Sequence, residues 1–423
     1  MSKQKRYLMK ISYINQVKNH LQDPLFKNSY FLMANMFIFS VVGFLFWIIA
    51  ARLYSTEEIG IASAIISVIS FFSIISLMGF DISLIRYLSK AENKQTMINS
   101  CFSLTILISS VISIIFLLGL DIWSPGLKIL RQNYLFGLLF IIFTIFASLS
   151  SLQLSVFVAF RKSKLSFYQS LMNTVRLIML PLLYSLGALG IYASFGVTYI
   201  LTFLFGNKLI KNVCSTYTFI PTMNTNLIKK MFSFSVGNFI ANVLIYIPSN
   251  LFPLLLLNIL GAETTAYFYI AWTLSSVLLT VPGSVSKSLF AEGSFSTEKF
   301  RKNVFKSVKL SFMIIIPSIF VIILFGKYFL LLFGNNYAKN SLELLIILSF
   351  AAIPHTIIQI YTSIKRIETN INPVIYLYTI IALITVIGAY IITPKIGLTG
   401  AGYSWLIANI ITASIAIIDL WRK

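Results

Sequence analysis

The feature that most constrains this sequence is a succession of apolar runs, each long enough to cross the ~30 Å hydrocarbon core of a bilayer as a helix. With 58% hydrophobic and 11% charged residues among its 423, the chain is predicted to be an all-α, polytopic membrane protein. Its twelve expected spans lie near 30–51, 59–80, 100–120, 134–160, 170–189, 191–208, 233–260, 264–290, 308–326, 342–364, 374–393 and 400–421.

Positive charges are distributed unevenly over the connections between the spans. When alternate connections are assigned to opposite sides, 25 of the 33 Lys and Arg residues fall on one side and 6 on the other, and the remaining two, Arg176 and Lys287, fall within spans. Positive residues favour the cytoplasmic side, so we expect a multi-pass protein of the cell membrane with both termini in the cytosol. The net charge of +21 then reflects topology, and no nucleic-acid partner is expected.

Internal repetition predicts how the spans are arranged. Four short motifs in the first half of the chain recur in the second half at offsets of 204 to 210 residues. Because six spans separate the copies, the copies share one orientation, as in transporters built from parallel repeats. We expect twelve transmembrane helices in two six-helix lobes around a central cavity, with a tail at 1–28, lobes at 29–209 and 232–421, and a cytoplasmic linker at 210–231. The matches pair Glu57–Gly60 with Glu263–Ala266, Gly119 with Gly326, Arg161–Lys162 with Lys365–Arg366, and Gly187–Gly190 with Gly397–Gly400.

The first 28 residues precede the first span and carry six positive charges. Ile11, Ile14, Val17 and Leu21 recur there at mostly helical spacing among Lys, Asn and Gln, which is typical of a helix that lies on a membrane surface. A solvated tail is the alternative. The apolar run that follows lacks the short core and the cleavage site of a removable signal, so we interpret it as the first retained helix.

The residues that enzyme chemistry needs are scarce. No glycine-rich phosphate loop ending in Gly-Lys-Ser/Thr occurs, the chain has two histidines, and no pair of carboxylates falls inside a span. ATP hydrolysis by that route, acid-base catalysis and metal binding therefore lack their residues. Cys101 and Cys214 fall near the predicted cytoplasmic face, where thiols stay reduced. We expect no catalytic residue, no metal and no cofactor, and hence no enzyme.

One span carries a cation among Leu, Ile and Met. Arg176 lies six residues into the run Ser170–Leu189, and an arginine in hydrocarbon costs about 2.5 to 3.5 kcal/mol even on the lenient insertion scale. Such a residue either faces protein, water or an anion, or snorkels along the helix to the near interface. The sequence leaves both interpretations open.

Polar side chains also recur at helical spacing in span seven. Asn238, Asn242 and Tyr246 lie on one face of it, and Pro248 and Pro253 are expected to interrupt the helix. Amides and a phenol in a row are costly against lipid. We interpret this row as the wall of a water-filled cavity.

Span ten places His355 and Gln359 on one face, with Pro354 freeing a carbonyl beside them. His355 falls near mid-membrane, where an ionisable residue is a functional candidate. The alternative for any such row is that hydroxyls and amides join helices, at about 0.6 kcal/mol per contact. We apply that alternative to the row in span four, Thr144, Ser148, Ser151 and Ser155.

Two further cations lie at the ends of spans. Lys287 lies within a turn of the cytoplasmic end of span eight, where snorkelling to the interface is the simpler interpretation. Arg86 belongs to an amphipathic stretch, 81–90, that would lie at the interface or face the mouth of the cavity. The candidate substrate-binding residues are Arg176, Asn173, Asn238, Asn242, Tyr246, His355, Gln359, Arg86 and Lys287.

Several motifs together point to one family. They are Arg52–Gly60 (RLYSTEEIG) before span two, Gly79–Arg86 after it, Gly261–Tyr267 after span seven, Phe333–Tyr337 before span ten and Gly397–Gly402 before span twelve. On these residues the chain, from about residue 30 onward, resembles the polysaccharide (O-antigen) flippase family of the MATE-like exporter superfamily.

The resemblance implies two lobes that rock about the cavity and move a polyprenyl-diphosphate-linked oligosaccharide across the cytoplasmic membrane by alternating access, for surface glycan biosynthesis. Its partners would be membrane lipids and other glycan assembly proteins, and Arg176 is the cation best placed for the diphosphate. The alternative is a cation-coupled multidrug exporter of the same superfamily, whose members usually keep an acidic residue inside a span; spans one and seven have none. A lipid II flippase, which typically has two further helices, and a membrane glycosyltransferase fit less well.

Overall fold

The computed structural model describes residues 24–215, 217–295, 300–368 and 370–421. Over these residues every regular element is a helix, and eleven helical stretches are long and apolar enough to cross a membrane. The prediction of an all-α, multi-span fold is therefore confirmed, whereas the expected tail lies outside the described residues up to position 23. The long helices are α2 (Pro24–Leu53), α3 (Thr56–Ser76), α5 (Lys94–Leu118), α8 (Tyr134–Ala159), α11 (Ala188–Lys211), α12 (Thr225–Leu260), α13 (Ala262–Phe295), α14 (Phe300–Leu331), α16 (Leu342–Phe350) continued by α17 (Ala352–Ile367), α18 (Asn372–Ile396) and α19 (Leu398–Trp421).

The run expected as a single helix at Ser170–Leu189 is built from shorter segments, so that prediction is wrong. The Asn173 side chain donates to the Ser170 carbonyl (3.0 Å), and the Thr174 hydroxyl donates to the Leu171 carbonyl (2.7 Å). Side chains that bond nearby carbonyls compete with the regular helical bonds, which accounts for a tighter turn here. The segments are α9 (Ser163–Leu171), the 3-10 turn Met172–Thr174, α10 (Val175–Leu182) and the 3-10 turn Tyr184–Leu186.

Prolines act differently from expectation in two places. Pro248 and Pro253 lie inside α12, which continues without a break, so the expected interruption is wrong. Both are buried, and neighbouring helices hold proline-containing membrane helices in place. The span expected at 342–364 is instead divided at Ala351 into α16 and α17. Pro354 lacks the N–H that would bond the carbonyl four residues earlier, which explains the break in the preceding turn.

Two glycine turns that suggested an internal repeat share one backbone conformation. Gly187 precedes α11 with φ 57° and ψ −136°, and Gly397 precedes α19 with φ 72° and ψ −149°, a region that favours glycine. Three residues later, a Cβ on Gly190 would lie 2.1 Å from the Leu183 carbonyl oxygen, and one on Gly400 would lie 2.7 Å from the backbone of α18. The two turns therefore join their helices with the same close approach.

Two other matches are displaced. Gly119 ends α5, but Gly326 lies inside α14, which continues for five more residues, so this pairing is wrong. The turn after α14 contains Gly334 instead, with φ 136°. Arg161–Lys162 follows α8, whereas Lys365–Arg366 lies in the last turn of α17. Helices α14 and α17 therefore extend a few residues past the matched positions.

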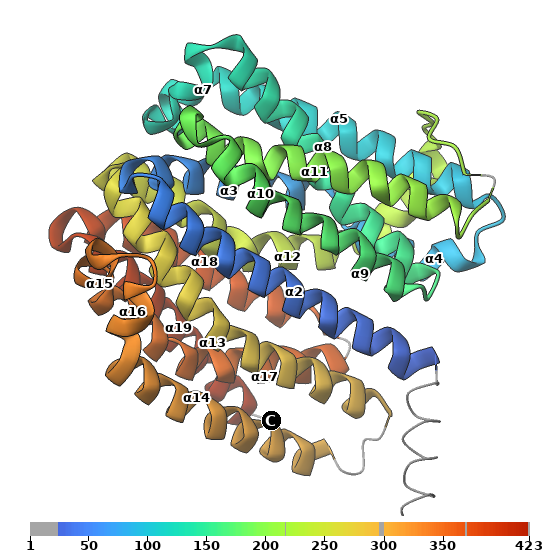
Figure 1. Cartoon of the computed structure of the whole chain (residues 1–423). Coiled ribbons are helices and arrows are strands. Elements are labelled where there is room, and N and C mark those ends of the chain that lie inside the picture. Colours follow the sequence, from blue (N-terminus) through green and yellow to red (C-terminus); the bar gives the residue numbers. More distant parts are fainter. Residues whose placement is uncertain (1–23, 216, 296–299, 369, 422–423) are drawn as a thin grey trace, which may run out of the picture.

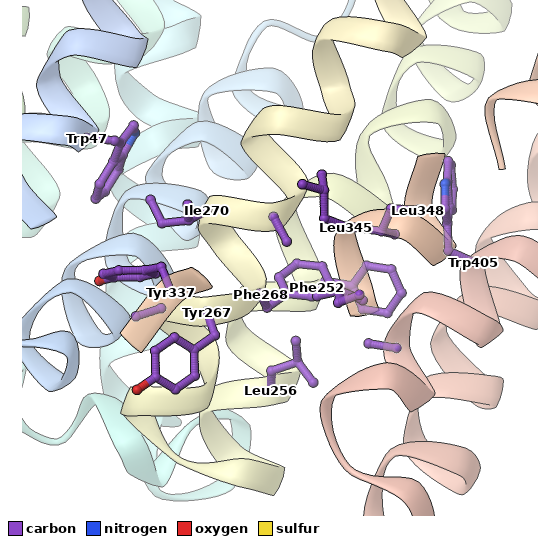
Figure 2. Close-up of a cluster of buried hydrophobic side chains, with 14 of the residues drawn as sticks. Trp47, Phe252, Leu256, Tyr267, Phe268, Ile270, Tyr337, Leu345, Leu348 and Trp405 are labelled. Atoms are coloured by element: carbon purple, nitrogen blue, oxygen red, sulfur yellow. The ribbon is translucent and has the colours of Figure 1, made fainter. Parts of the chain in front are cut away.

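The helices run roughly side by side between two ends of the molecule (Figure 1). We call the end with α7 (Ile129–Gln132) and α15 (Asn335–Asn340) the hairpin end, and the end with α4 (Phe80–Tyr87), residues 212–215 and residues 217–224 the linker end. Between the two halves of the chain, α3 packs against α12 and α13. The largest buried cluster draws on both halves: its members include Trp47 of α2, Phe252 of α12 and Phe268 of α13 (Figure 2).

At the hairpin end the two halves are closely joined. The guanidinium of Arg52, at the end of α2, donates to the carbonyl oxygens of Leu332 (3.0 Å) and Leu331 (2.7 Å) at the end of α14. A Cβ on Gly60 would lie 1.7 Å from the Ala262 carbonyl oxygen, so glycine is required where α3 meets α13. The hairpin end is therefore closed between the halves.

Helix α2 changes partners along its length. Toward the hairpin end the Trp47 ring lies 4.6 Å from the Tyr269 ring of α13. Toward the linker end the Phe31 ring lies 5.8 Å from the Phe167 ring of α9, in its own half. α2 therefore leaves the second half as it approaches the linker end, and α10 lies beside it at this transition.

Candidate functional site

Tyr54 holds the segment that carries Arg176. Its buried hydroxyl donates to the Leu180 carbonyl (2.6 Å), one turn after Arg176 on α10. Burial, with Glu58 nearby, raises the pKa of Tyr54 to about 12, so this hydroxyl keeps its proton at neutral pH. α10 is thereby attached to the connection between α2 and α3.

Arg176 lies inside the protein, within a cage of aromatic rings. Its side chain is only 3% exposed, so the snorkelling interpretation is wrong. The guanidinium carbon lies 4.8 Å from the ring centroid of Phe195, 5.5 Å from that of Phe39 and 5.7 Å from that of Phe46. Each such contact contributes about 0.5 to 2 kcal/mol. The cage is therefore assembled from α2, α10 and α11.

Two nitrogens of this guanidinium lack acceptors. Nε and Nη2 of Arg176 are buried and donate no hydrogen bond to any described residue. A buried charge left uncompensated costs about 3 to 5 kcal/mol. Gly43 of α2 faces Nη2, because a Cβ there would lie 3.7 Å away, and Tyr199 and Tyr269 are close enough to interact electrostatically with the guanidinium. An anionic ligand with oxygen acceptors would satisfy both nitrogens.

Four other candidates line a cavity of about 300 Å³ in the second half, which we call the second cavity. Asn242 and Tyr246 reach it from α12, Gln359 from α17 and Lys287 from α13. Part of the polar row on α12 therefore does face a cavity. Lys287 is exposed and lines that same cavity, so its charge lies beside polar groups of three helices.

His355 makes contacts through both ring nitrogens. Nδ1 lies 3.1 Å from Asn409 Oδ1, and Nε2 lies 3.1 Å from Gln359 Nε2. Asn409 Nδ2 donates to the Trp405 carbonyl (2.8 Å), which leaves its Oδ1 to accept and assigns the histidine proton to Nδ1. Gln359 Nε2 then donates to His355 and also to the Tyr378 hydroxyl (3.4 Å). His355 therefore orients a residue of the cavity wall.

The remaining candidates lie elsewhere. Asn173 donates to the Ser170 carbonyl of the preceding helix α9, and Asn238 is half-buried on α12. Arg86 is exposed, and its guanidinium carbon lies 4.2 Å from the Phe234 ring centroid, so it joins α4 to α12. None of these three is among the residues that line the second cavity or form the aromatic cage.

The row in span four bonds to its own helix. The hydroxyls of Thr144, Ser148 and Ser151 each donate to the carbonyl four residues earlier, at 2.7 to 3.0 Å. Such back-bonding satisfies the hydroxyls without a ligand. The interpretation of this row as structural is therefore supported.

One buried charged cluster among the described residues joins two helices. No group of three or more His, Cys, Asp or Glu side chains in this part of the chain could hold a metal ion. Lys365 is buried and pairs with Asp419 (2.5 Å) and Glu368 (3.7 Å), which joins α17 to α19. Its neighbour Arg366 points differently and lines the second cavity with Tyr378.

Arg366 and Tyr378 were missed by the sequence analysis. Arg366 had been counted with the positive charge of the cytoplasmic side, yet it continues the row of His355 and Gln359 along α17 and could have been found by extending that row. Tyr378 lies on α18, where no polar row marks it. Nothing in the sequence singled out the phenylalanines that surround Arg176, because the chain contains 37 Phe.

Comparison with known proteins then identifies the family. A family model described as "Polysaccharide biosynthesis protein" matches residues 49–343, more than half of the chain. This chain belongs to the polysaccharide biosynthesis protein family. The matched range includes Arg176 and Lys287, and it ends before α17.

Individual relatives agree with this family. A Shigella flexneri protein described as "Putative O-antigen transporter" is 28% identical over 199 residues, which cover 44% of this chain and 45% of that protein. The chain thus matches less than half the length of that relative. Among solved structures, the lipid II flippase MurJ in an inward closed conformation has a TM-score of 0.74 at 18% identity, covering 92% of this chain and 87% of MurJ.

A second class of transporter has a similar fold. An inward-facing multidrug resistance MATE family transporter of the MOP superfamily has a TM-score of 0.63 at 14% identity, covering 92% of this chain and 93% of that one. At such low identities these likenesses establish the fold alone. The chain has the fold of MOP superfamily transporters, and MurJ matches it more closely than this MATE transporter does.

Proposed function

We propose that this protein is a flippase that moves a polyprenyl-diphosphate-linked oligosaccharide across the cell membrane for surface glycan biosynthesis. The observation that carries the proposal is Arg176, a buried and caged cation with two nitrogens that lack acceptors. Membership of the polysaccharide biosynthesis family and the relative described as an O-antigen transporter support the same substrate class. The fold shared with a lipid II flippase also favours it.

In this proposal Arg176 binds the diphosphate. Phosphate oxygens would accept from Nε and Nη2 in charge-assisted hydrogen bonds, each worth about 1.5 to 3 kcal/mol. Phe46 and Phe195 are buried, whereas Phe39 is 55% exposed, so the head group would approach past Phe39. The rings keep water from the charge, which strengthens its attraction for the anion.

During transport the protein would alternate between two states, one closed at the hairpin end and one closed at the linker end. The structure is closed at the hairpin end, and we propose that this state receives the substrate from the linker end. Opening the other way requires breaking the hydrogen bonds from Arg52 to α14 and separating Gly60 from Ala262. A bound substrate drives this change only to the extent that it binds the second state more tightly.

The other candidates are assigned to contacts with the oligosaccharide along its path, and the aromatic and amide side chains among them suit sugar hydroxyls and ring faces. Other glycan assembly proteins would deliver the substrate and receive it. The assigned residues are Asn173, Asn238, Asn242, Tyr246, His355, Gln359, Arg86 and Lys287.

Sidedness follows from the charge asymmetry, with the linker end and both termini in the cytosol of a cell-membrane protein. Single cysteines at Lys128 and Lys395, in a background with Cys101 and Cys214 replaced by serine, should react with an impermeant thiol reagent in intact cells. A cysteine at Lys162 should react only after permeabilisation. All of these native side chains except the two cysteines are exposed, so the opposite labelling pattern would invert the topology.

Reconstitution tests the function directly. Purified protein in liposomes should move a fluorescent polyprenyl-diphosphate oligosaccharide between leaflets, and deletion in the native host should cause such intermediates to accumulate. The cation-coupled drug exporter is the competing outcome. If the liposomes concentrate cationic dyes against a gradient and leave the lipid-linked oligosaccharide in place, the proposed function is wrong and the exporter is right.

A further inference from the structure

We propose that the second cavity binds an acidic group on the sugars of the substrate, a carboxylate or a phosphate, separately from the diphosphate at Arg176. The inference rests on the proposed function and narrows its substrate to an acidic glycan. It starts from the cations that the second cavity contains, one from α13 and one from α17.

The charges of Lys287 and Arg366 are available to a ligand. Both side chains are exposed and line the second cavity, and within the described part of the chain neither forms an ion pair. Lys365, next to Arg366, is instead neutralised by Asp419 and buried. The chain thus compensates one of two adjacent cations internally and leaves the other facing the cavity.

Acidic groups of the protein do not cancel this charge. Asp81 of α4 interacts electrostatically with Tyr246 at the wall of the second cavity, and no carboxylate is among the residues that line it. The cavity wall therefore carries two positive charges, and Asp81 is an acidic neighbour outside the wall. A guanidinium and an ammonium that converge in this way are typical of sites for carboxylate or phosphate.

The wall between the cations is suited to a sugar and is held in place. Asn242 and Gln359 present amides, and Tyr246 and Tyr378 present rings. Gln359 is oriented by His355, and Ser363 donates to the Ser286 carbonyl (2.7 Å), which ties α17 to α13. A wall whose rotamers are already fixed loses less entropy when it binds.

The size of the second cavity limits what it binds. Its volume of about 300 Å³ is at the lower end of the 300 to 1,000 Å³ typical of small-molecule sites. It therefore accommodates a sugar or two with the acidic group, and the lipid and the rest of the oligosaccharide lie elsewhere. The second cavity is also distinct from the Arg176 cage, because the cage is built from helices of the first half of the chain.

The test compares two substrates and two double variants in proteoliposomes. The substrates are a lipid-linked oligosaccharide with one uronic acid and its carboxyl-reduced, neutral counterpart. K287Q/R366Q should lower the transport rate of the acidic substrate at least about tenfold, the factor for roughly 1.5 kcal/mol of charge-assisted hydrogen bonding. It should lower the rate of the neutral substrate much less, because only the acidic one presents an anion to the two cations. R301Q/K302Q removes one Arg and one Lys from exposed positions of α14 outside the second cavity and should change neither rate.

The inference would be overturned if K287Q/R366Q lowered the transport rates of both substrates equally, or lowered neither. An effect that appears only in vesicles rich in anionic phospholipid, and equally for both substrates, would assign the cations to a lipid head group and also overturn it. Equal thermal unfolding of the two double variants in detergent excludes misfolding as the cause of a selective loss. If the wild-type protein moves neither substrate, the proposed function fails, and binding of a free uronic-acid oligosaccharide to wild type but not to K287Q/R366Q still decides the inference.

Discussion

The Arg176 cage and the second cavity both offer positive charge, but they hold it in opposite ways. Arg176 is buried among rings with two nitrogens unsatisfied, whereas Lys287 and Arg366 are exposed and lie among amides and tyrosines. A desolvated cation gains a full compensating interaction when an anion arrives, while a hydrated one must first release water. The buried Arg176 cage is therefore suited to strong binding of the diphosphate, and the exposed second cavity is suited to selecting among substrates.

The largest effect should follow from removing the buried cation. Arg176→Ala should reduce transport of lipid-linked oligosaccharide in proteoliposomes at least about 100-fold, since roughly 3 kcal/mol of charge-assisted hydrogen bonding is lost, and the protein should still insert. Arg176→Lys should retain part of the rate, because the charge stays but the planar fork is lost. Wild-type transport by Arg176→Ala would make the cage structural and erase the contrast between the two sites.

A smaller effect is expected from covering the guanidinium without removing it. Gly43→Leu should lower the rate about tenfold, because a side chain at this position would cover Nη2, and displacing one charged hydrogen bond costs about 1.5 kcal/mol. Gly43→Ala is the matched control, since its Cβ would make an ordinary 3.7 Å contact. Equal rates for the two variants would show that the ligand does not approach Nη2 from α2.

A modest effect is expected at the second cavity when its wall loses its orientation. His355→Gln should slow transport a few-fold, roughly the factor for 0.5 to 1 kcal/mol, because Gln359 loses the acceptor that positions it. The rate should keep its dependence on membrane potential, measured with a potassium gradient and valinomycin. Loss of that dependence would instead make His355 the coupling group of a cation-driven exporter.

The smallest effect should come from the support of the cage. Tyr54→Phe removes the hydrogen bond to the Leu180 carbonyl and should destabilise the protein by about 1 to 2 kcal/mol, seen as a lower midpoint of thermal unfolding in detergent. Transport should fall less than for Gly43→Leu. Tyr184→Phe is the control, because Tyr184 is 55% exposed beside Tyr54. Identical midpoints for the two variants would contradict the role of Tyr54.

Prediction from the sequence succeeded for features that depend on the spacing of residues within one helix. It failed for features that depend on how neighbouring helices pack. The row on span seven correctly placed Asn242 and Tyr246 on a cavity wall, since helical spacing alone puts them on one face. The same reasoning failed for the prolines of α12, because packing against neighbours decides whether a proline breaks a helix. The sequence also could not show that Lys287 shares a cavity wall with polar groups of α12 and α17, because those groups lie far away in sequence.

The sequence by itself determined that the chain crosses a membrane many times as helices, and it indicated the repeat of the Gly187 and Gly397 turns. Hydropathy and glycine conformation are properties of consecutive residues, so neither needs knowledge of distant parts of the chain. Only the tertiary structure decided that Arg176 is caged and that Arg366 joins Lys287. Phe39 and Phe46 lie on α2, whereas Phe195 lies on α11, far away in sequence. The free energy of a charge in a membrane depends on what other helices place around it.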